Sequence, residues 1–486
     1  MKISAIRFRV GLSLGAMVCL AWVATGGAGP RAAEDPLRGY QGTISELQDR
    51  ALSGSGAFDF VRDLTVQVGP RFAGSPGDRA GVDWAVARLQ ALGFHNVRRE
   101  AVTVPHWVRG EAAGRIVAPF PQPVVLVALG GSVATPAGGL EAEVLRVESV
   151  QALEALEADQ VAGKIVFFDG GMMERARTGA GYRTSVMPRT LGANAAGPKG
   201  AVAVLIRSAG TSTDRIAHTG AMRPYAEGAP KIPAAALSNP DADLLSAQLD
   251  TGEPVRFFLK LTPRNLPPVT SFNVIGEIRG REKPEEIVLM VGHLDSWDLG
   301  TGAIDDGSGC AIVTEAARLV GELRRRPRRT LRVLLTANEE FGLSGARAYA
   351  AAHEDEMDRH VAAMESDFGA GRVWQFRTLV QEDKLDLVQG IYRFLEPLGI
   401  EAGNNEARGG ADLSPLRRFN IPFFDLAHDG TLYFDYHHTV NDTLSKIDPK
   451  DLAQGVAAYA TLAYLLADLE PGVGRAPAQE EGEQRR

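Results

Sequence analysis

The sequence predicts an α/β fold with a second, β-rich unit inserted into it. Between residues 266 and 470, short apolar runs typical of strands alternate with segments of helical periodicity. Between residues 111 and 265 the pattern changes to short β-rich runs that glycine and proline clusters separate. Histidine and carboxylate side chains follow several of the apolar runs beyond residue 266, where open α/β sheets bind their ligands. We therefore expect one α/β domain that carries a functional site, interrupted by an accessory domain.

Length and composition are typical of a globular protein with two or three domains. The chain has 486 residues, of which 45% are hydrophobic, so each domain can bury a full core. The net charge is -8, and no long block of one sign lies within the body of the chain. Because the charge distribution gives no sign of the basic patch that nucleic-acid binding requires, we predict no nucleic-acid partner.

Residues 1–33 have the pattern of a signal peptide and leader. Basic residues come first, an apolar run follows over residues 10–23, and small residues extend to Ala33. This run is too short to span a bilayer comfortably, so we expect a secreted or periplasmic protein without stable membrane insertion after cleavage. An uncleaved amino-terminal anchor is the alternative. Cys310 is the only cysteine beyond the run, which excludes an intrachain disulfide in the mature protein.

The first part of the α/β domain is expected over residues 34–110. Val82, Val86 and Leu89 recur at helical spacing, and a strand is predicted after this helix. The inserted unit follows, and it contains no cluster of metal-ligating residue types, which favours an accessory role. The proline-rich stretch 263–268 is predicted to be the linker back to the α/β domain. The strands expected in these two segments are 97–104, 124–129, 141–147, 164–169 and 202–206.

The second part of the α/β domain is expected over residues 266–470. Ile312, Ala316 and Leu319 share one helical face, as a helix that covers a parallel sheet requires. Beyond residue 470 the glycine, proline and charged residues predict a disordered tail, 471–486. The expected strands are 273–279, 287–292, 331–337, 361–364 and 421–426, and the expected helices are 310–323, 344–353 and 451–469.

Polar residues follow the predicted strands or their adjoining loops at four places. Singly, each has an ordinary structural explanation, such as a hydrogen-bonded histidine, a carboxylate that fixes a turn, or a solvated loop glutamate. Together they match the residue types that bind zinc, and four separate structural explanations become strained. These residues are His293, Asp305, Glu340 and Asp367.

Five motifs extend this pattern. They are His293-Leu294-Asp295, Asp305-Asp306-Gly307-Ser308-Gly309, Glu339-Glu340-Phe341-Gly342-Leu343-Ser344-Gly345, Glu365-Ser366-Asp367 and His438-Thr439-Val440-Asn441-Asp442-Thr443. These motifs occur in the order seen in the binuclear zinc aminopeptidase and glutamate carboxypeptidase family, which the chain resembles over nearly its whole mature length. The resemblance implies a phosphorylase/hydrolase-like three-layer catalytic domain with a mixed central sheet, and it identifies the inserted unit as a protease-associated domain.

The resemblance implies a role for each residue of the site. Asp305 would bridge two zinc ions, with His293 and Asp367 completing one site. Glu340 and His438 would complete the other. Of the adjacent His437 and His438, we choose His438 because the family places Asp and Thr four and five positions later. We expect His437 to be a packed or hydrogen-bonded neighbour.

Two further residues are expected to take part in the chemistry. Glu339 would act as the general base, and Asp295 would sit behind the metal and orient it or the imidazole of His293. Three carboxylates and a bridging hydroxide would offset the charge of two zinc ions and leave the site near neutral. Zinc lowers the pKa of bound water to roughly 7. Glu339 could then pass the water's proton to the leaving amine.

The resemblance also places a substrate-binding loop at Gly410 and Asp412, and Tyr433 would contact substrate. An ordinary connection between a helix and a strand, and a packed tyrosine, are equally open explanations of these residues.

The resulting hypothesis is an exported exopeptidase with two Zn²⁺ per chain that hydrolyses dipeptides or short peptides, with the inserted unit covering the site. It leaves open whether the enzyme is an aminopeptidase, a carboxypeptidase or a dipeptidase, and whether it is a homodimer, as related enzymes often are. One alternative is an inactive binding or receptor-like protein on the same scaffold. Another is a glutaminyl cyclase with a single zinc ion. The intact base argues against the first alternative, and the two sets of ligand types favour two ions over one.

Overall fold

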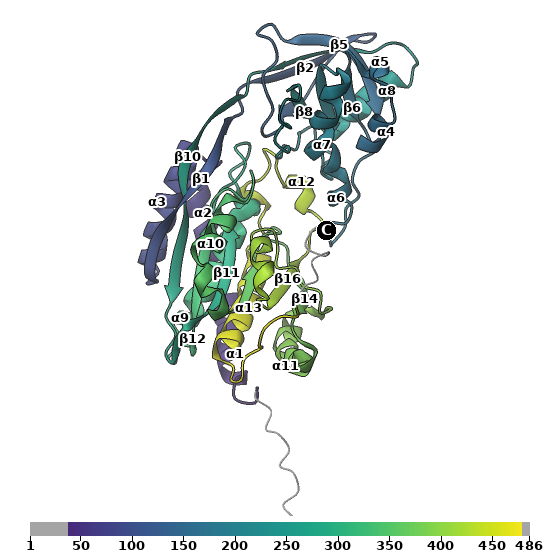
Figure 1. Cartoon of the computed structure of the whole chain (residues 1–486). Coiled ribbons are helices and arrows are strands. Elements are labelled where there is room, and N and C mark those ends of the chain that lie inside the picture. The colour runs from purple at the N-terminus through teal and green to yellow at the C-terminus, as the bar shows by residue number, and fades with distance from the viewer. Residues whose placement is uncertain (1–36, 479–486) are drawn as a thin grey trace, which may run out of the picture.

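Two eight-stranded sheets form the framework of the protein in a computed structural model, which describes residues 37–478 (Figure 1). The expected signal peptide and leader, residues 1–33, lies outside the described residues. None of the helices within residues 37–478 combines the length and the apolar character that a membrane span requires. The fold is therefore a mixed α/β arrangement of two sheet-containing units.

The first sheet has the strand order β1-β10-β12-β11-β13-β16-β14-β15 and is mixed. At its centre β11 runs parallel to β12 and to β13, while β10 pairs antiparallel with β1 and β12, and β14 pairs antiparallel with β16. Every residue of β12 is buried, as expected for a strand covered on both faces. The strands are β1 (His95–Val108), β10 (Arg264–Ile278), β11 (Lys283–His293), β12 (Arg329–Thr336), β13 (His360–Glu365), β14 (Val373–Leu379), β15 (Glu401–Ala402) and β16 (Phe423–His428).

Helices cover both faces of this sheet. Along β11, Val288 and Met290 join the core under one set of helices, whereas Leu289 and Val291 face a separate core with Tyr349 of α10. The alternation follows from the two-residue period of a strand, so an uninterrupted apolar run fills two cores at once. The helices of this unit are α1 (Gln41–Leu52), α2 (Ala57–Gln67), α3 (Pro76–Ala91), α9 (Ser308–Gly321), α10 (Ser344–Ala352), α11 (Leu385–Leu395), α12 (Tyr433–Tyr436) and α13 (Pro449–Asp468).

The second sheet, with strand order β3-β2-β9-β5-β6-β7-β8-β4, belongs to a separate unit whose strands lie between Ala112 and Leu261. We call residues 112–261 the second unit. Two apolar cores lie against this sheet. Its strands are β2 (Ala112–Ala118), β3 (Gln122–Val124), β4 (Leu126–Ala128), β5 (Leu140–Val147), β6 (Ile165–Phe168), β7 (Ala203–Arg207), β8 (Ala234–Leu237) and β9 (Arg256–Leu261). Its helices are α4 (Val150–Glu154), α5 (Ala158–Val161), α6 (Tyr182–Ser185), α7 (Met187–Ala196) and α8 (Asn239–Leu249).

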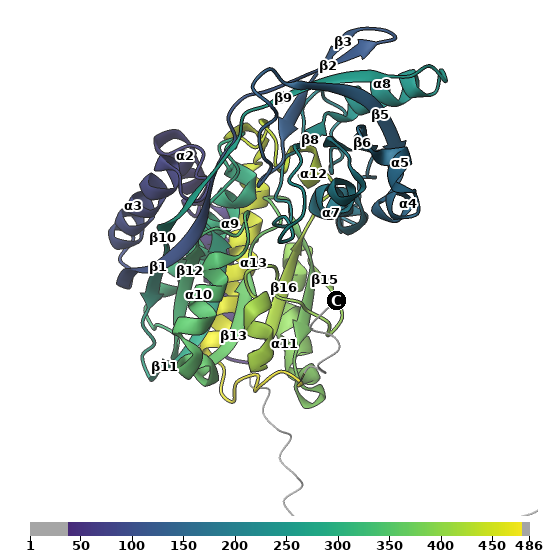
Figure 2. The same ribbon diagram turned by 45° about the horizontal axis from the view of Figure 1, so that its top comes forward.

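The expected linker 263–268 is wrong, because most of this stretch belongs to β10. Together, β1 and β10 form a long antiparallel ribbon that runs from the first sheet toward the second unit (Figures 1 and 2). Pro267 and Pro268 fall at an irregularity between the pairs Val104–Val269 and His106–Leu266. A bulge tolerates proline because no ladder hydrogen bond is required there.

Two other expectations need correction. The strand expected at 124–129 is divided at Val125, whose N–H donates to Asp241 (2.8 Å) instead of continuing one ladder. In the expected disordered tail 471–486, residues 471–478 are described, and the guanidinium of Arg475 donates to the carbonyls of Met357 (3.2 Å) and His360 (2.8 Å). This part of the tail is therefore bound to the first unit.

Candidate active site

The predicted site residues lie at one end of the first sheet. His293 is the last residue of β11, Glu340 follows β12, and Asp367 follows β13. Because these three strands are parallel neighbours, their carboxyl ends meet at the same edge. Asp305 comes from the turn before α9, and His438 comes from the loop after α12. The fold thus brings residues from five segments together.

The carboxylate of Asp305 lies at the centre of the group. Its Oδ1 is 3.0 Å from Nε2 of His293, and that nitrogen is 3.4 Å from Oδ1 of Asp367. Its Oδ2 is 3.4 Å from Nε2 of His438, which in turn is 2.8 Å from Oε2 of Glu340. The two oxygens of one carboxylate therefore face two different pairs, each made of one imidazole and one carboxylate.

The residues present fit a zinc centre. Two ligands of one tetrahedral zinc ion, each about 2.0–2.1 Å from the metal, lie roughly 3.3 Å apart, close to the separations described above. Within residues 37–478, Oδ2 of Asp305 and Oε1 of Glu340 are buried without a hydrogen-bond partner. Burying unpaired carboxylate oxygens is costly unless a cation neutralises them. Histidine nitrogens and carboxylate oxygens are also the ligand types that zinc accepts.

The electrostatics of the group favour bound positive charge. Burial disfavours a charged ring at His293, yet the carboxylates of Asp367 and Asp305 hold the pKa of His293 well above its ordinary value. At His438, burial is likewise outweighed, chiefly by Glu340, so the pKa of His438 is also raised. Burial raises the pKa of Glu339 well above its ordinary value, and the neighbouring Asp367 carboxylate adds to the effect. A buried excess of carboxylates thus surrounds the two imidazoles.

Asp295 contacts the site in two ways. Its main-chain carbonyl lies 3.0 Å from Nδ1 of His293, and its carboxylate accepts a hydrogen bond from the N–H of Glu339 (3.0 Å). The carboxylate itself is 3.8 Å from the imidazole. The ring of His293 is therefore held by the main chain, and the side chain of Asp295 fixes the backbone of Glu339.

Sequence reasoning gave no role to Asp306, Glu365 or Asp442, although all three stand inside the quoted motifs. Asp306 accepts hydrogen bonds from the N–H groups of His293 (3.0 Å) and Gly309 (2.9 Å). Asp442 accepts from the N–H groups of Ile304 (2.7 Å) and Asp305 (3.3 Å). Glu365 accepts from the N–H groups of Ala411 (3.0 Å), Asp412 (3.2 Å) and Leu413 (2.9 Å). In the sequence, only their position beside the predicted ligands could have indicated a role for these three carboxylates. In the structure, they hold the backbone of the loops that form the site.

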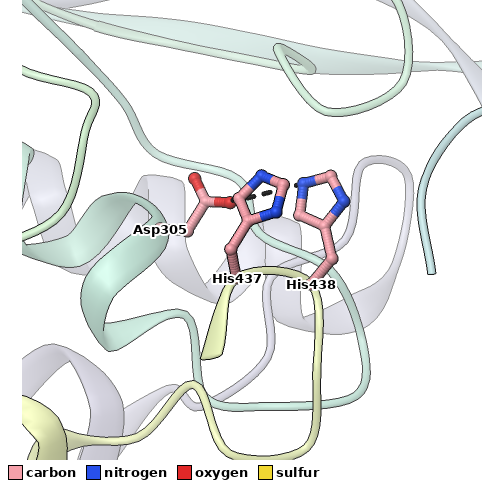
Figure 3. A group of neighbouring side chains, drawn as sticks. All are labelled: Asp305, His437 and His438. Atoms are coloured by element: carbon pink, nitrogen blue, oxygen red, sulfur yellow. Dashed lines mark ion pairs between the residues drawn. The ribbon is translucent and has the colours of Figure 1, made fainter. Parts of the chain in front are cut away.

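His437 also reaches the centre of the site. Its Nε2 is 3.5 Å from Oδ2 of Asp305, the oxygen that His438 approaches, and the two rings stack with centroids 3.5 Å apart (Figure 3). Asp305, His437 and His438 form one of the residue groups with metal-ligand spacing. His438 has the further contact with Glu340, which keeps it in the two-pair arrangement around Asp305.

The expected substrate-binding residues lie in different surroundings. Gly410 is exposed, adopts φ 88°, and lines a cavity of about 200 Å³ together with Asp367 and Trp374. A Cβ at Gly410 would overlap the carboxylate of Glu365, so only glycine fits there. Tyr433 is buried, and its ring centroid is 4.9 Å from those of Phe368 and His437. The side chain of Asp412 is buried and accepts a hydrogen bond from the hydroxyl of Thr336, so it faces β12 rather than this cavity.

The sequence of this chain is similar to those of known peptidases. Residues 273–463 match the model of peptidase family M28. The chain is 33% identical to carboxypeptidase Q of Mus musculus over 445 residues, which cover 90% of this chain and 92% of the relative.

Two solved structures are similar over most of the chain. A peptidase M28 precursor from Shewanella amazonensis SB2B has 50% identity and a TM-score of 0.88, with 90% of this chain and 99% of that chain covered. A zinc aminopeptidase from Bacillus subtilis has 20% identity and a TM-score of 0.61, covering 87% and 98%. At that identity the second likeness concerns the fold alone.

Proposed function

Because the chain belongs to peptidase family M28, we propose that it is a zinc-dependent exopeptidase that hydrolyses dipeptides or short peptides. The observation that carries this proposal is the position of Asp305, whose two oxygens face two separate pairs of ligand-type side chains. One carboxylate between two such pairs is what a site for two ions requires. The carboxypeptidase named among the relatives favours a reaction at a peptide end.

Each half of the site would hold one zinc ion. His293 and Asp367 would hold one, Glu340 and His438 would hold the other, and Asp305 would contact both. Zinc bound there would supply Lewis-acid activation of water and of the scissile carbonyl. The neighbouring Asp306 and Asp442 keep the turn of Asp305 in place through its backbone.

Glu339 is the proposed general base. Its carboxylate would take a proton from the attacking water and return it to the leaving amine. Asp295 fixes its backbone, and burial raises the pKa of Glu339, which suits a group that must hold a proton during the reaction. Adjacent Glu340 points at His438 instead, so the two neighbouring glutamates are free to perform different tasks.

The finer domain assignment belongs to the same proposal. The catalytic domain would be residues 34–110 and 266–470, in a phosphorylase/hydrolase-like three-layer form. A protease-associated domain, residues 111–265, would be inserted between its two parts. The strands of the second sheet, all between Ala112 and Leu261, support these bounds. Export through residues 1–33 would place the enzyme outside the cytoplasm. The second unit would restrict the site to small substrates, and Gly410 and Tyr433 would contact them.

Hydrolysis of a peptide panel tests the proposal. Zinc-loaded protein should cleave unblocked dipeptides, and comparison with amino-blocked and carboxyl-blocked versions shows which terminus the enzyme reads. Treatment with a chelator should abolish the activity, and added zinc should restore it. Failure to cleave any peptide in the zinc-loaded state would favour a binding protein on this scaffold. Cyclisation of amino-terminal glutamine without peptide cleavage would favour the glutaminyl cyclase.

A further inference from the structure

The loop that carries the two histidines is held along its length by the second unit. This loop, residues 429–438, crosses the region between the two units, and Figure 1 shows α12, part of this loop, lying there. Main-chain groups of the second unit bond to main-chain groups of the loop at successive points. The bonds are Gly430 N–H to Arg177 O (2.8 Å), Thr211 N–H to Phe434 O (2.9 Å) and Thr219 N–H to His438 O (2.9 Å). Nδ1 of His218 adds a contact with the carbonyl of His437 (2.8 Å).

Thr219 sets the orientation of the His438 ring. Its main-chain carbonyl lies 3.2 Å from Nδ1 of His438. A carbonyl oxygen only accepts hydrogen bonds, so in the neutral imidazole the hydrogen must sit on Nδ1. Nε2 is then left with its lone pair, and this is the nitrogen that faces Asp305 and Glu340. The second unit thereby selects the tautomer that a metal ligand needs.

The backbone of His438 also depends on Thr219. His438 adopts φ 62°, in the left-handed region, which is unfavourable for a residue other than glycine. Such a conformation persists only where surrounding contacts enforce it. The hydrogen bond from the N–H of Thr219 to the carbonyl of His438 is one such contact, so both main-chain groups of Thr219 act on this histidine.

Thr219 is itself anchored to both units. Its hydroxyl donates to the carbonyl of Ala128 (3.1 Å) and accepts from Nη1 of Arg109 (3.0 Å). Nε of Arg109 in turn donates to both carboxylate oxygens of Asp298 (2.9 and 3.0 Å), in the loop after β11. The position of the carbonyl that holds His438 therefore depends on the hydroxyl of Thr219.

A second anchor lies at Asp435. Its carboxylate accepts the hydroxyl of Thr211 (2.6 Å) and a bidentate pair of bonds from the guanidinium of Arg175 (3.0 and 2.9 Å). Thr211 and Asp435 are both buried, so this contact is shielded from solvent and salt. It fixes α12 just before His437 and His438.

We propose that the second unit is a structural part of the metal centre, with Thr219 and Thr211 as positioning residues for His438. The proposal rests on the two-ion function proposed above. It assigns the second unit more than a covering role, because the half-site of Glu340 and His438 is incomplete without it. The half-site of His293 and Asp367 is oriented from within the first unit, by the carbonyl of Asp295.

Zinc affinity of full-length protein tests this inference. Thr219→Val and Thr211→Val each remove one anchoring hydroxyl and keep the shape of the side chain. Thr251→Val is the control, since its hydroxyl donates to the carbonyl of Gln248 (2.8 Å) and accepts from the N–H of Glu253 (3.3 Å), both within the second unit. Competition with a chelator of known affinity should show that the ion held by Glu340 and His438 loses roughly 10–100-fold in affinity in both test variants. The other ion and the control should be unchanged, and Thr219→Ser should recover most of the loss.

The outcomes separate this inference from the proposed function. Unmutated protein that binds no zinc contradicts the two-ion function itself. Protein that binds two ions, with unchanged affinities in both test variants, overturns only the role of the second unit. Thermal unfolding of the metal-free variants shows whether each is folded. If Thr219→Val does not fold, Thr211→Val decides the question, because it acts through the other anchor.

Discussion

The two imidazoles at the candidate metal centre are each held by a main-chain carbonyl, but the two carbonyls come from very different parts of the chain. His293 ends a central strand, and its Nδ1 contacts the carbonyl of Asp295, only two residues further along the chain. His438 lies in a loop, and its Nδ1 contacts the carbonyl of Thr219, 219 residues away in the other unit. One half of the site is thus built locally at a strand end, while the other half is assembled across the whole chain. The first unit alone therefore does not supply every group that orients the ligands of the candidate metal centre.

Asp305 is the residue on which both halves depend, and its removal should have the largest effect. We expect Asp305→Ala to lose both zinc ions and to reduce hydrolysis by more than the roughly 10²–10⁴-fold that a general base contributes. Metal content and dipeptide turnover measure this. Retention of either ion at unchanged affinity would show that the halves are independent and would contradict the central position of this carboxylate.

Glu339 should separate chemistry from metal binding. Because its carboxylate is proposed to move a proton and not to hold an ion, Glu339→Gln should keep the metal content and lose roughly 10²–10⁴-fold in turnover. Single-turnover kinetics on zinc-loaded protein give the size of the loss. Turnover within about tenfold of the unmutated enzyme is too small a loss for a general base and would remove Glu339 from that role.

Substitutions confined to one half test the comparison itself. Asp367→Ala should lose the ion held with His293, whereas His438→Ala should lose the ion held with Glu340, each leaving about one zinc ion per chain. Anomalous X-ray scattering locates the ion that remains. Loss of both ions from either variant would mean that the halves bind cooperatively rather than as separate sites.

The smallest effect is expected at Asp442, which holds the backbone of Ile304 and Asp305 without reaching an imidazole. Asp442→Asn keeps one acceptor oxygen and removes the other. Outer partners of metal ligands typically contribute about 10–100-fold in affinity, so we expect a loss within that range at both halves. Isothermal titration with zinc measures it, and a loss at one half alone would contradict a role through Asp305.

The locally built half was the more predictable from the sequence. The apolar runs of β11 and β12 predicted central strands, because strands buried on both faces are uninterruptedly apolar, and the polar residue that follows each run marked the site. The clustering of His293, Asp305, Glu340 and Asp367 is present in the structure.

The half assembled across the chain gave much weaker signals. His438 was placed only through a resemblance, and nothing in the sequence pointed to Thr219, since a main-chain carbonyl contributes no distinctive residue type. The strand that includes Pro267 and Pro268 was predicted as a linker because proline disfavours strands, and the bulge that admits both residues depends on the partner strand β1. Asp412 was expected near substrate, yet its side chain is buried and accepts a hydrogen bond from Thr336 at the end of β12.

The zinc content of purified, unmutated protein tests the central claim most directly. The protein should be equilibrated with zinc and freed of unbound metal. Inductively coupled plasma mass spectrometry then gives the number of zinc ions per chain. Two facing pairs around Asp305 predict about two zinc ions per chain. A value near zero would contradict the account, and a value near one would favour a centre with a single ion.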